Sequence, residues 1–123
     1  MRRRLAGLLL FAGSAMAQEG FPLDGTWRAE RVAADGGHRT IVLLMDWDGQ
    51  RINGVIDPGP EATRFTSAAL DPARWTVTFE ATNGRGQPIA FEGTLAELGK
   101  YNRKLTGKWT EGGQAFDLRF VRE

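Results

Sequence analysis

Apolar and polar residues alternate along most of the chain from residue 23 to its end. Because successive side chains of a strand point to opposite faces, this period of two is typical of β-strands with one buried face. Clusters of Gly, Pro, Asn and Asp interrupt the alternation and mark turns. The pattern predicts eight strands, at residues 23–32, 38–47, 50–57, 63–70, 74–82, 88–96, 103–110 and 114–122. The connection at residues 97–102 is a candidate for a short helical turn.

Glycine recurs inside four of these strands in the pattern apolar-x-Gly-x-apolar, at Gly25, Gly54, Gly93 and Gly107. Period two places each glycine on the same face as its apolar neighbours, which is the face that we expect to be buried. Glycine weakens the interior of a strand, so its repeated use needs a reason. Bending at a barrel corner is one reason, and room for a neighbouring tryptophan is the other. Both indicate a closely packed, concave interior.

One hairpin is predicted at Asp48–Gly49, the pair that two-residue type I′ turns favour most. A two-residue turn there places Leu43 opposite Gly54 and Val42 opposite Val55. Apolar side chains then meet apolar side chains or glycine on one face, and Asp46 and Arg51 form a charge pair on the other. A shift of one residue would bring charged side chains to the buried face, so the faces of this hairpin are well specified.

A second hairpin is predicted at Gly112–Gly113, again with a two-residue turn. It places Trp109 opposite Phe116 on the buried face and Lys108 opposite Asp117 on the solvent face. Like the first hairpin, it tolerates no shift of one residue. The two hairpins therefore give consistent faces independently of each other.

Two further turns complete a chain of short connections. Asn83–Gly86 predicts a hairpin loop of three or five residues, and Asp71–Pro72 predicts a turn in which proline fixes φ. Consecutive strands joined by short loops form a meander, and eight such strands fit a closed barrel without exposed edges. We therefore expect an all-β fold, a single antiparallel up-and-down barrel or meander of about eight strands.

The two ends of the strand region carry a pattern seen in a known group of barrels. Gly25-Thr26-Trp27 opens the first predicted strand, and Arg119 and Arg122 lie in the last. This resembles the calycin group, which comprises lipocalins, fatty-acid-binding proteins and avidins. The resemblance implies that Trp27 closes the base of the barrel. It further implies that Arg119 or Arg122 packs across that tryptophan in a cation–π contact.

The amino terminus has the layout of a cleavable signal peptide. Arginines at positions 2–4 precede an uncharged apolar run over residues 5–13, and Ala15-Met16-Ala17 follows as an A-x-A cleavage pattern. The apolar run is shorter than the roughly 20 residues of a membrane-spanning helix. An amphipathic or buried N-terminal helix is the alternative. We expect residues 1–17 to be removed, leaving a single β-barrel domain over 18–123 in a periplasmic or secreted protein without a membrane span.

Charge and cysteine content exclude several classes of protein. Without the three arginines of the leader, 13 basic residues stand against 15 acidic ones, a net charge of −2. No basic run remains, so we expect no nucleic-acid partner. The chain has no cysteine, so disulfides cannot stabilise it outside the cell. The hydrophobic core has to supply the stability.

Catalytic and metal-binding patterns are weak. His38 is the only histidine and follows a glycine turn, where solvent exposure is expected. Without cysteine or a second histidine, a zinc or copper site is not expected. Asp46-x-Asp48-Gly49 matches part of a calcium loop but lacks the distal glutamate, and a hairpin turn explains it better. We therefore expect no catalytic residues, no metal, no cofactor and no enzymatic activity.

Four tryptophans are the one compositional excess of the chain. An eight-stranded barrel is about wide enough for its own side chains or for one small ligand, so core filling and a ligand cavity are both open. The leading expectation is an exported, non-enzymatic binding protein with a small apolar or aromatic ligand at the barrel mouth. The expected ligand-binding residues are Trp47, Trp75, Phe79, Phe91 and Trp109.

Strand 38–47 is apolar on both faces, which departs from the simple alternation. Val42, Leu44 and, across the hairpin, Val55 are predicted to lie on the outer surface; we call them the outer patch. Exposed apolar patches on small proteins mark contacts. A homodimer partner, another protein or Phe21 from the N-terminal segment are the alternatives. A protein-interaction or inhibitor module that uses this patch is therefore the second functional expectation.

Overall fold

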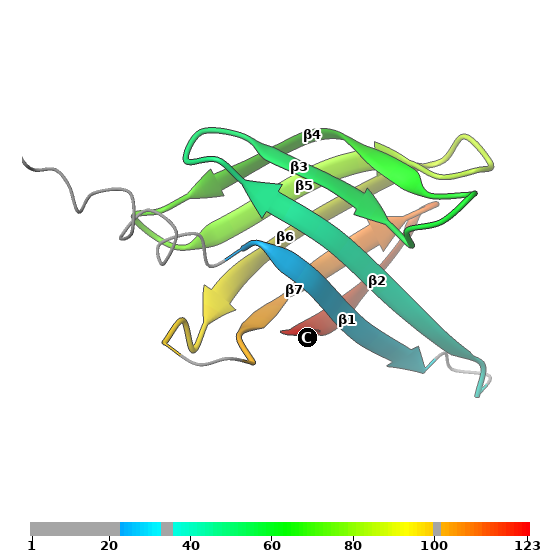
Figure 1. Ribbon diagram of the computed structural model, residues 1–123. Coiled ribbons are helices and arrows are strands. Elements are labelled where there is room, and N and C mark those ends of the chain that lie inside the picture. Colours follow the sequence, from blue (N-terminus) through cyan, green and yellow to red (C-terminus); the bar gives the residue numbers. More distant parts are fainter. Residues whose placement is uncertain (1–22, 33–35, 100–101) are drawn as a thin grey trace, which may run out of the picture.

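The computed structural model describes residues 23–32, 36–99 and 102–123, and these residues form one closed antiparallel barrel. The strands follow one another around the barrel in chain order, and the last pairs with the first to close it (Figure 1). The predicted all-β fold and the up-and-down barrel are confirmed. The strands are β1 (Gly25–Val32), β2 (His38–Trp47), β3 (Ile52–Ile56), β4 (Thr63–Asp71), β5 (Thr76–Thr82), β6 (Pro88–Ala96), β7 (Lys104–Glu111) and β8 (Gln114–Arg122).

The predicted leader at residues 1–17 and the position of Phe21 lie outside the described residues. Among the residues that the structure does describe, no helix is long and apolar enough to cross a membrane.

Two strand boundaries differ from the predicted ones because a residue there has a positive φ. β5 begins at Thr76 rather than at residue 74, because Trp75 has a φ of 56°, which extended strands do not adopt. At Asp57 a φ of 53° ends β3 one residue early. β6 ends at Ala96 as predicted, and Glu97 after it has a φ of 58°. Residues 98–99 form a turn, and residues 100–101 of the segment that was expected to hold a short helical turn lie outside the described residues.

The β7–β8 hairpin has the predicted register. Trp109 lies opposite Phe116, and Lys108 lies opposite Asp117, with ammonium and carboxylate 3.7 Å apart. The loop of the β5–β6 hairpin spans residues 83–87, which is the longer of the two predicted lengths. The faces that were assigned from these turns are correct.

The β2–β3 hairpin has a different register from the predicted one. Leu43 lies opposite Ile56 rather than Gly54, so the ladder is displaced by two residues. Because the displacement is even, every side chain keeps its face, and Leu43 and Ile56 are both buried. The prediction was wrong in register and right in the choice of buried face.

The cause of this displacement is a four-residue loop at positions 48–51 in place of a two-residue turn. The carboxylate of Asp48 accepts hydrogen bonds from the backbone N–H groups of Gln50 at 2.8 Å and Arg51 at 2.7 Å. These bonds lower the pKa of Asp48. An aspartate that binds the backbone ahead of it stabilises a longer turn.

The inward-facing glycines make room for close neighbours. Gly107 lies opposite Gly93, and a Cβ at Gly107 would lie 2.1 Å from the carbonyl oxygen of Glu92. At Gly54 a Cβ would lie 2.4 Å from the ring of Phe65. Of the two predicted reasons for the glycines, room for a close neighbour is therefore supported. The neighbours are backbone atoms and a phenylalanine ring, whereas a tryptophan was predicted.

The two ends of the barrel differ. At the end where β1 begins, Leu23 and Trp27 are fully buried and fill the interior; we call it the closed end. The opposite end carries the loops at 57–62, 83–87 and 112–113; we call it the open end. Between them the core is purely hydrophobic, since the described residues include no buried polar or charged side chain.

Candidate functional site

Inward-facing side chains change from apolar to polar as the strands reach the open end. Ala29 and Ile41 are buried, and the next inward positions on the same strands are Arg31 and Arg39. The β5–β6 loop and the strands β7 and β8 continue the same row with amides and one carboxylate. These side chains line a hollow of about 610 Å³. We call them the mouth ring: Arg31, Arg39, Asn83, Gln87, Glu111 and Gln114.

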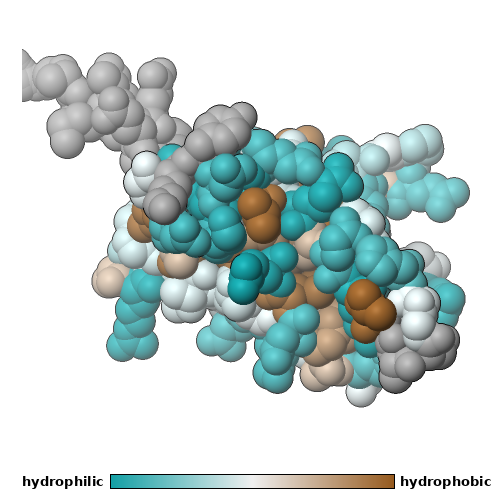
Figure 2. Space-filling model, turned by 90° about the horizontal axis from the view of Figure 1, so that it is seen from below, coloured by the Kyte–Doolittle hydropathy of each residue, from teal (hydrophilic) through white to brown (hydrophobic). Residues whose placement is uncertain are grey.

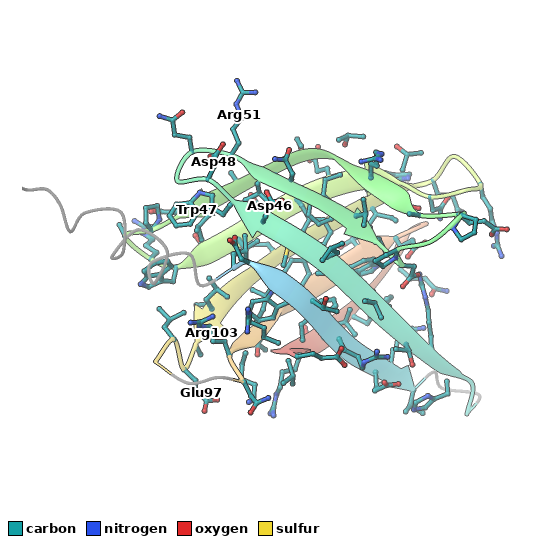
Figure 3. All side chains as sticks on the ribbon, in the orientation of Figure 1. Asp46, Trp47, Asp48, Arg51, Glu97 and Arg103 are labelled. Atoms are coloured by element: carbon teal, nitrogen blue, oxygen red, sulfur yellow. The ribbon has the colours of Figure 1, made fainter. Side chains whose placement is uncertain are left out.

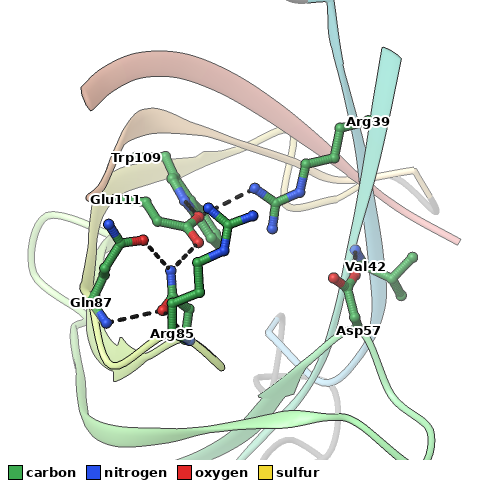
Figure 4. Close-up of polar contacts among 8 residues, drawn as sticks. Arg39, Val42, Asp57, Arg85, Gln87, Trp109 and Glu111 are labelled. Carbon is green, nitrogen blue, oxygen red and sulfur yellow. Dashed lines mark hydrogen bonds and ion pairs between the residues drawn. The ribbon is translucent and has the colours of Figure 1, made fainter. Parts of the chain in front are cut away.

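Three arginines surround this hollow. Arg31 lies directly opposite Arg39 in the β1–β2 ladder, so two cations face each other on the inner side of the barrel. The guanidinium of Arg31 lies over the ring of Phe116, 3.8 Å from its centroid. Arg85, from the β5–β6 loop, lines the same hollow, and its side chain points toward Glu111 in Figure 4. Like charges directly opposite each other in a ladder, such as those of Arg31 and Arg39, are destabilising unless an anion lies near them.

Glu111 is the one carboxylate among the residues that line the hollow. Its Oε1 accepts hydrogen bonds from Trp109 Nε1 at 2.9 Å and from Arg39 Nη1 at 3.2 Å, and its Oε2 accepts one from Asn83 Nδ2 at 2.8 Å (Figure 4). Burial alone would raise the pKa of Glu111. The hydrogen bonds from Asn83, Trp109 and Arg39 outweigh burial and lower it. Glu111 is therefore held as an anion.

Asn83 fixes the loop that carries Arg85. Its side-chain amide donates to Gln87 Oε1 at 3.1 Å, and its Oδ1 accepts bonds from the backbone N–H groups of Arg85 and Gln87, each at 2.9 Å. The loop therefore has internal hydrogen bonds that position Arg85 without using its guanidinium.

Beneath the mouth ring, aromatic rings fill the barrel. Phe79 stacks on Phe65 with centroids 4.1 Å apart, and Phe91 lies 5.1 Å from Phe79. Trp109 meets Phe79 edge to face at 5.7 Å, and Phe120 lies 6.2 Å from Trp109. Ring pairs at these distances are in contact. Core filling thus accounts for the interior at this level.

The five residues predicted to bind ligand are divided between core and closed end. Phe79, Phe91 and Trp109 are at most 2% exposed. Trp47 ends β2 and Trp75 precedes β5, so both lie at the closed end, half-buried. Of the five, Trp109 alone reaches the mouth ring, through its bond to Glu111. The structure does not bring the five together at one opening.

The closed end contains the residues of the G-x-W resemblance. Trp27 is fully buried, and its Nε1 donates to the carbonyl oxygen of Leu23 at 2.7 Å. Arg122 lies opposite Trp27, and its Nε donates to the carbonyl oxygen of Asp24 at 2.6 Å. Gly25 leaves the space that the Arg122 guanidinium occupies, since a Cβ there would lie 2.9 Å from its Nε.

Arg119 has a different place from Arg122. It is exposed on the outer face of β8, opposite Thr106. Of the two arginines that were predicted to pack across Trp27, Arg122 is therefore the one near it.

The outer patch lies on the outside of β2 and β3. Leu44 pairs with Val55 and is 46% exposed, while Val42 and Val55 are half-buried. Asp57 crosses from the end of β3 to accept a hydrogen bond from the backbone N–H of Val42 at 3.0 Å.

On the face drawn in Figure 2, hydrophobic surface is divided into small areas between hydrophilic side chains.

The remaining sequence candidates have ordinary structural roles. His38 is exposed, with its Nδ1 3.5 Å from Glu30. Asp46 lies in β2 opposite Asn53, whereas Asp48 lies in the loop at the closed end (Figure 3). Within the described ranges, no group of three or more His, Asp or Glu side chains is arranged to hold a metal ion.

A second hollow, of about 400 Å³, lies on the outer face of β4 to β7. Small side chains such as Ala69 and Ala90 form its floor between Glu80, Glu92 and Lys108. These charges are of both signs and exposed, so this surface gives less basis for selective binding than the mouth ring does.

Comparisons with family models, with curated proteins and with solved structures find no significant match to the chain. The chemistry of the open end is therefore the basis for a functional proposal. Sequence reasoning missed the mouth ring, although a signal was present. Arg31 and Arg39 continue the inward phase of Ala29 and Ile41, where a buried face should contain no charge.

Proposed function

We propose that the protein is an exported, non-enzymatic binding protein that takes a small ligand at the open end of its barrel. The observation that carries the proposal is the mouth ring, a polar and cationic lining above an aromatic core. Ligand pockets combine apolar walls with a few polar groups that fix orientation, and barrel mouths are frequent sites for them. The opposite end is filled by side chains, so the ligand enters at the mouth.

An apolar or aromatic part of the ligand has Phe116 as its neighbour at this opening, because Phe116 is half-buried, lies beneath Arg31 and lines the hollow. Trp109 is fully buried under Glu111, so it borders the mouth without lining it. Binding rather than catalysis is favoured by the state of Glu111. Its lowered pKa keeps it ionised, and an ionised carboxylate that already accepts three hydrogen bonds is a poor general acid.

We also propose that the barrel is of the calycin type. The support comes from the closed end, where the Trp27 of the G-x-W pattern is buried and Arg122 lies opposite it. Ligand binding inside or at the mouth of the barrel is what this resemblance implies.

Nuclear magnetic resonance tests the binding function directly. The probes are indole-3-acetate and its neutral amide, titrated into the protein. The indole Nε1–H of Trp109 and the side-chain amides of Asn83, Gln87 and Gln114 report on the mouth, and the Nε1–H of Trp27 reports on the closed end as the internal control. Saturable shifts confined to the mouth signals support the proposal. No saturable shift with either probe overturns it.

The exposure of Leu44 favours a second candidate, a protein-interaction module that uses the outer patch. Of its possible partners, a second copy of the chain is the simplest to test. Sedimentation should then give a concentration-dependent dimer, and Leu44→Lys should make it a monomer without unfolding the barrel. If the wild-type protein sediments as a monomer at every concentration, the proposal of a dimer is rejected.

A further inference from the structure

The mouth has an excess of positive charge that its own residues do not neutralise. Arg31, Arg39 and Arg85 line the hollow with Glu111 as the single acidic group. Arg39 is paired with Glu111 at 3.2 Å, and Arg31 lies on an aromatic ring. Within the part of the chain that the structure describes, neither Arg31 nor Arg85 forms an ion pair. Two guanidinium groups therefore remain for an incoming anion.

Arg31 and Arg39 place two positive charges opposite each other, and Glu111 is paired with only one of them. They lie directly opposite each other on the inner face of β1 and β2, where barrel walls concentrate their field. Like charges in directly opposed positions of a ladder are destabilising. The repulsion falls when an anion binds between them.

Glu111 indicates which kind of anion fits. Its carboxylate already lies within the mouth and receives hydrogen bonds from Arg39 and Asn83. The donors of the ring therefore suit a planar carboxylate, and the forked guanidinium group matches this geometry with two parallel bonds. Arg31 and Arg85 can supply such forks to a second carboxylate beside that of Glu111.

We propose that the mouth recognises the carboxylate of a small organic acid, gripped by Arg31 and Arg85 with Arg39 shared between the ligand and Glu111. This inference rests on the proposed binding function and adds the chemical class of the ligand. The rest of the ligand lies in the hollow of about 610 Å³ beside Phe116.

Indole-3-acetate and indole-3-acetamide share the same ring and differ in charge, so comparing their affinities isolates the contribution of the carboxylate. Indole-3-acetate should bind more than about tenfold more tightly than indole-3-acetamide, as loss of a charge-assisted hydrogen bond predicts. Arg31→Gln and Arg85→Gln should each weaken the acid by more than they weaken the amide, so the ratio of the two affinities should fall in both variants. Arg74→Gln is the control, because Arg74 is exposed in the β4–β5 turn at the closed end.

The outcomes distinguish this inference from the binding function beneath it. Equal affinity of acid and amide, or full acid affinity in both variants, overturns the carboxylate proposal while binding at the mouth stands. Inorganic sulfate that moves the same signals as strongly as the acid overturns it as well, in favour of a free oxyanion. If neither indole compound binds, the binding function itself fails. Arg85 lies in an exposed loop, so Arg85→Gln should fold and report on binding even if Arg31→Gln does not fold.

Discussion

The indole Nε1 of Trp109 donates a 2.9 Å hydrogen bond to the carboxylate of Glu111, two residues further along β7. One strand thus connects the fully buried aromatic core to the charged open end. The bond satisfies the only polar atom of the indole, and it holds Glu111 where Arg39 and Asn83 also reach it. Occupancy of the mouth is therefore expected to be visible at a core tryptophan.

Glu111 should stabilise the fold in a pH-dependent way. Its pKa in the folded protein lies below the ordinary value of 4.5, so its contribution is present above that pH and is lost as the pH falls through the folded pKa. Glu111→Gln should lower the free energy of unfolding at pH 7 by about 1 kcal/mol. Urea denaturation across pH 3 to 7 measures it. A difference between variant and wild type that stays constant below pH 4.5 contradicts this account.

Arg122 and Arg119 should differ in their effect on stability. Arg122 occupies the space beside Gly25 and donates to the carbonyl oxygen of Asp24, whereas Arg119 is exposed on the outer face. Arg122→Ala should destabilise the barrel by about 1–3 kcal/mol, and Arg119→Ala by less than about 0.5 kcal/mol. Thermal unfolding compares them. Equal losses would show that the arginine at the closed end has no special role.

The amino terminus gives a prediction about processing. The layout of residues 1–17 should direct export and cleavage after Ala17. Mass spectrometry of the protein recovered from the periplasm or medium should then find Gln18, or its cyclised form, as the first residue. Intact Met1 on the folded, exported protein would reject the leader.

The strands were predictable because their alternation is local and repeated. Gly112–Gly113 gave the correct pairing since Gly accepts the positive φ values, 57° and 85°, that this two-residue turn requires. Asp48–Gly49 misled, because the Asp48 side chain binds two backbone N–H groups beyond it and lengthens the loop. The composition of the turns was therefore enough to predict which faces are buried. It did not reveal that the β2–β3 register is displaced by two residues, because an even displacement leaves every side chain on its face.

The mouth was less predictable than the barrel. Arg31 and Arg39 are brought together by strand pairing, but Arg85 comes from a loop more than forty residues further along the chain. Alternation says which side chains point inward. It does not say at which end the interior stops being filled, and that depends on how the rings of Phe79, Phe91 and Trp109 pack.

The last prediction concerns the contact between β6 and β7. Gly107 faces Gly93, and a Cβ there would lie 2.4 Å from the Gly93 Cα and 2.1 Å from the Glu92 carbonyl oxygen. Because the obstructing atoms are backbone, no side chain can rotate away, and the two strands have to separate. Gly107→Ala should cost about 3 kcal/mol, the upper part of the range for overpacked sites.

Two controls isolate that contact. Gly84→Ala makes the same chemical change in the β5–β6 loop, where an added Cβ meets nothing within 4 Å, and Thr106→Val alters the exposed neighbour on the same strand. Both should remain within about 0.5 kcal/mol of the wild type. Urea midpoints compare the three variants. If Gly107→Ala unfolds at the same midpoint as Gly84→Ala, the two strands do not approach as closely as described, and the glycine repeat needs another explanation.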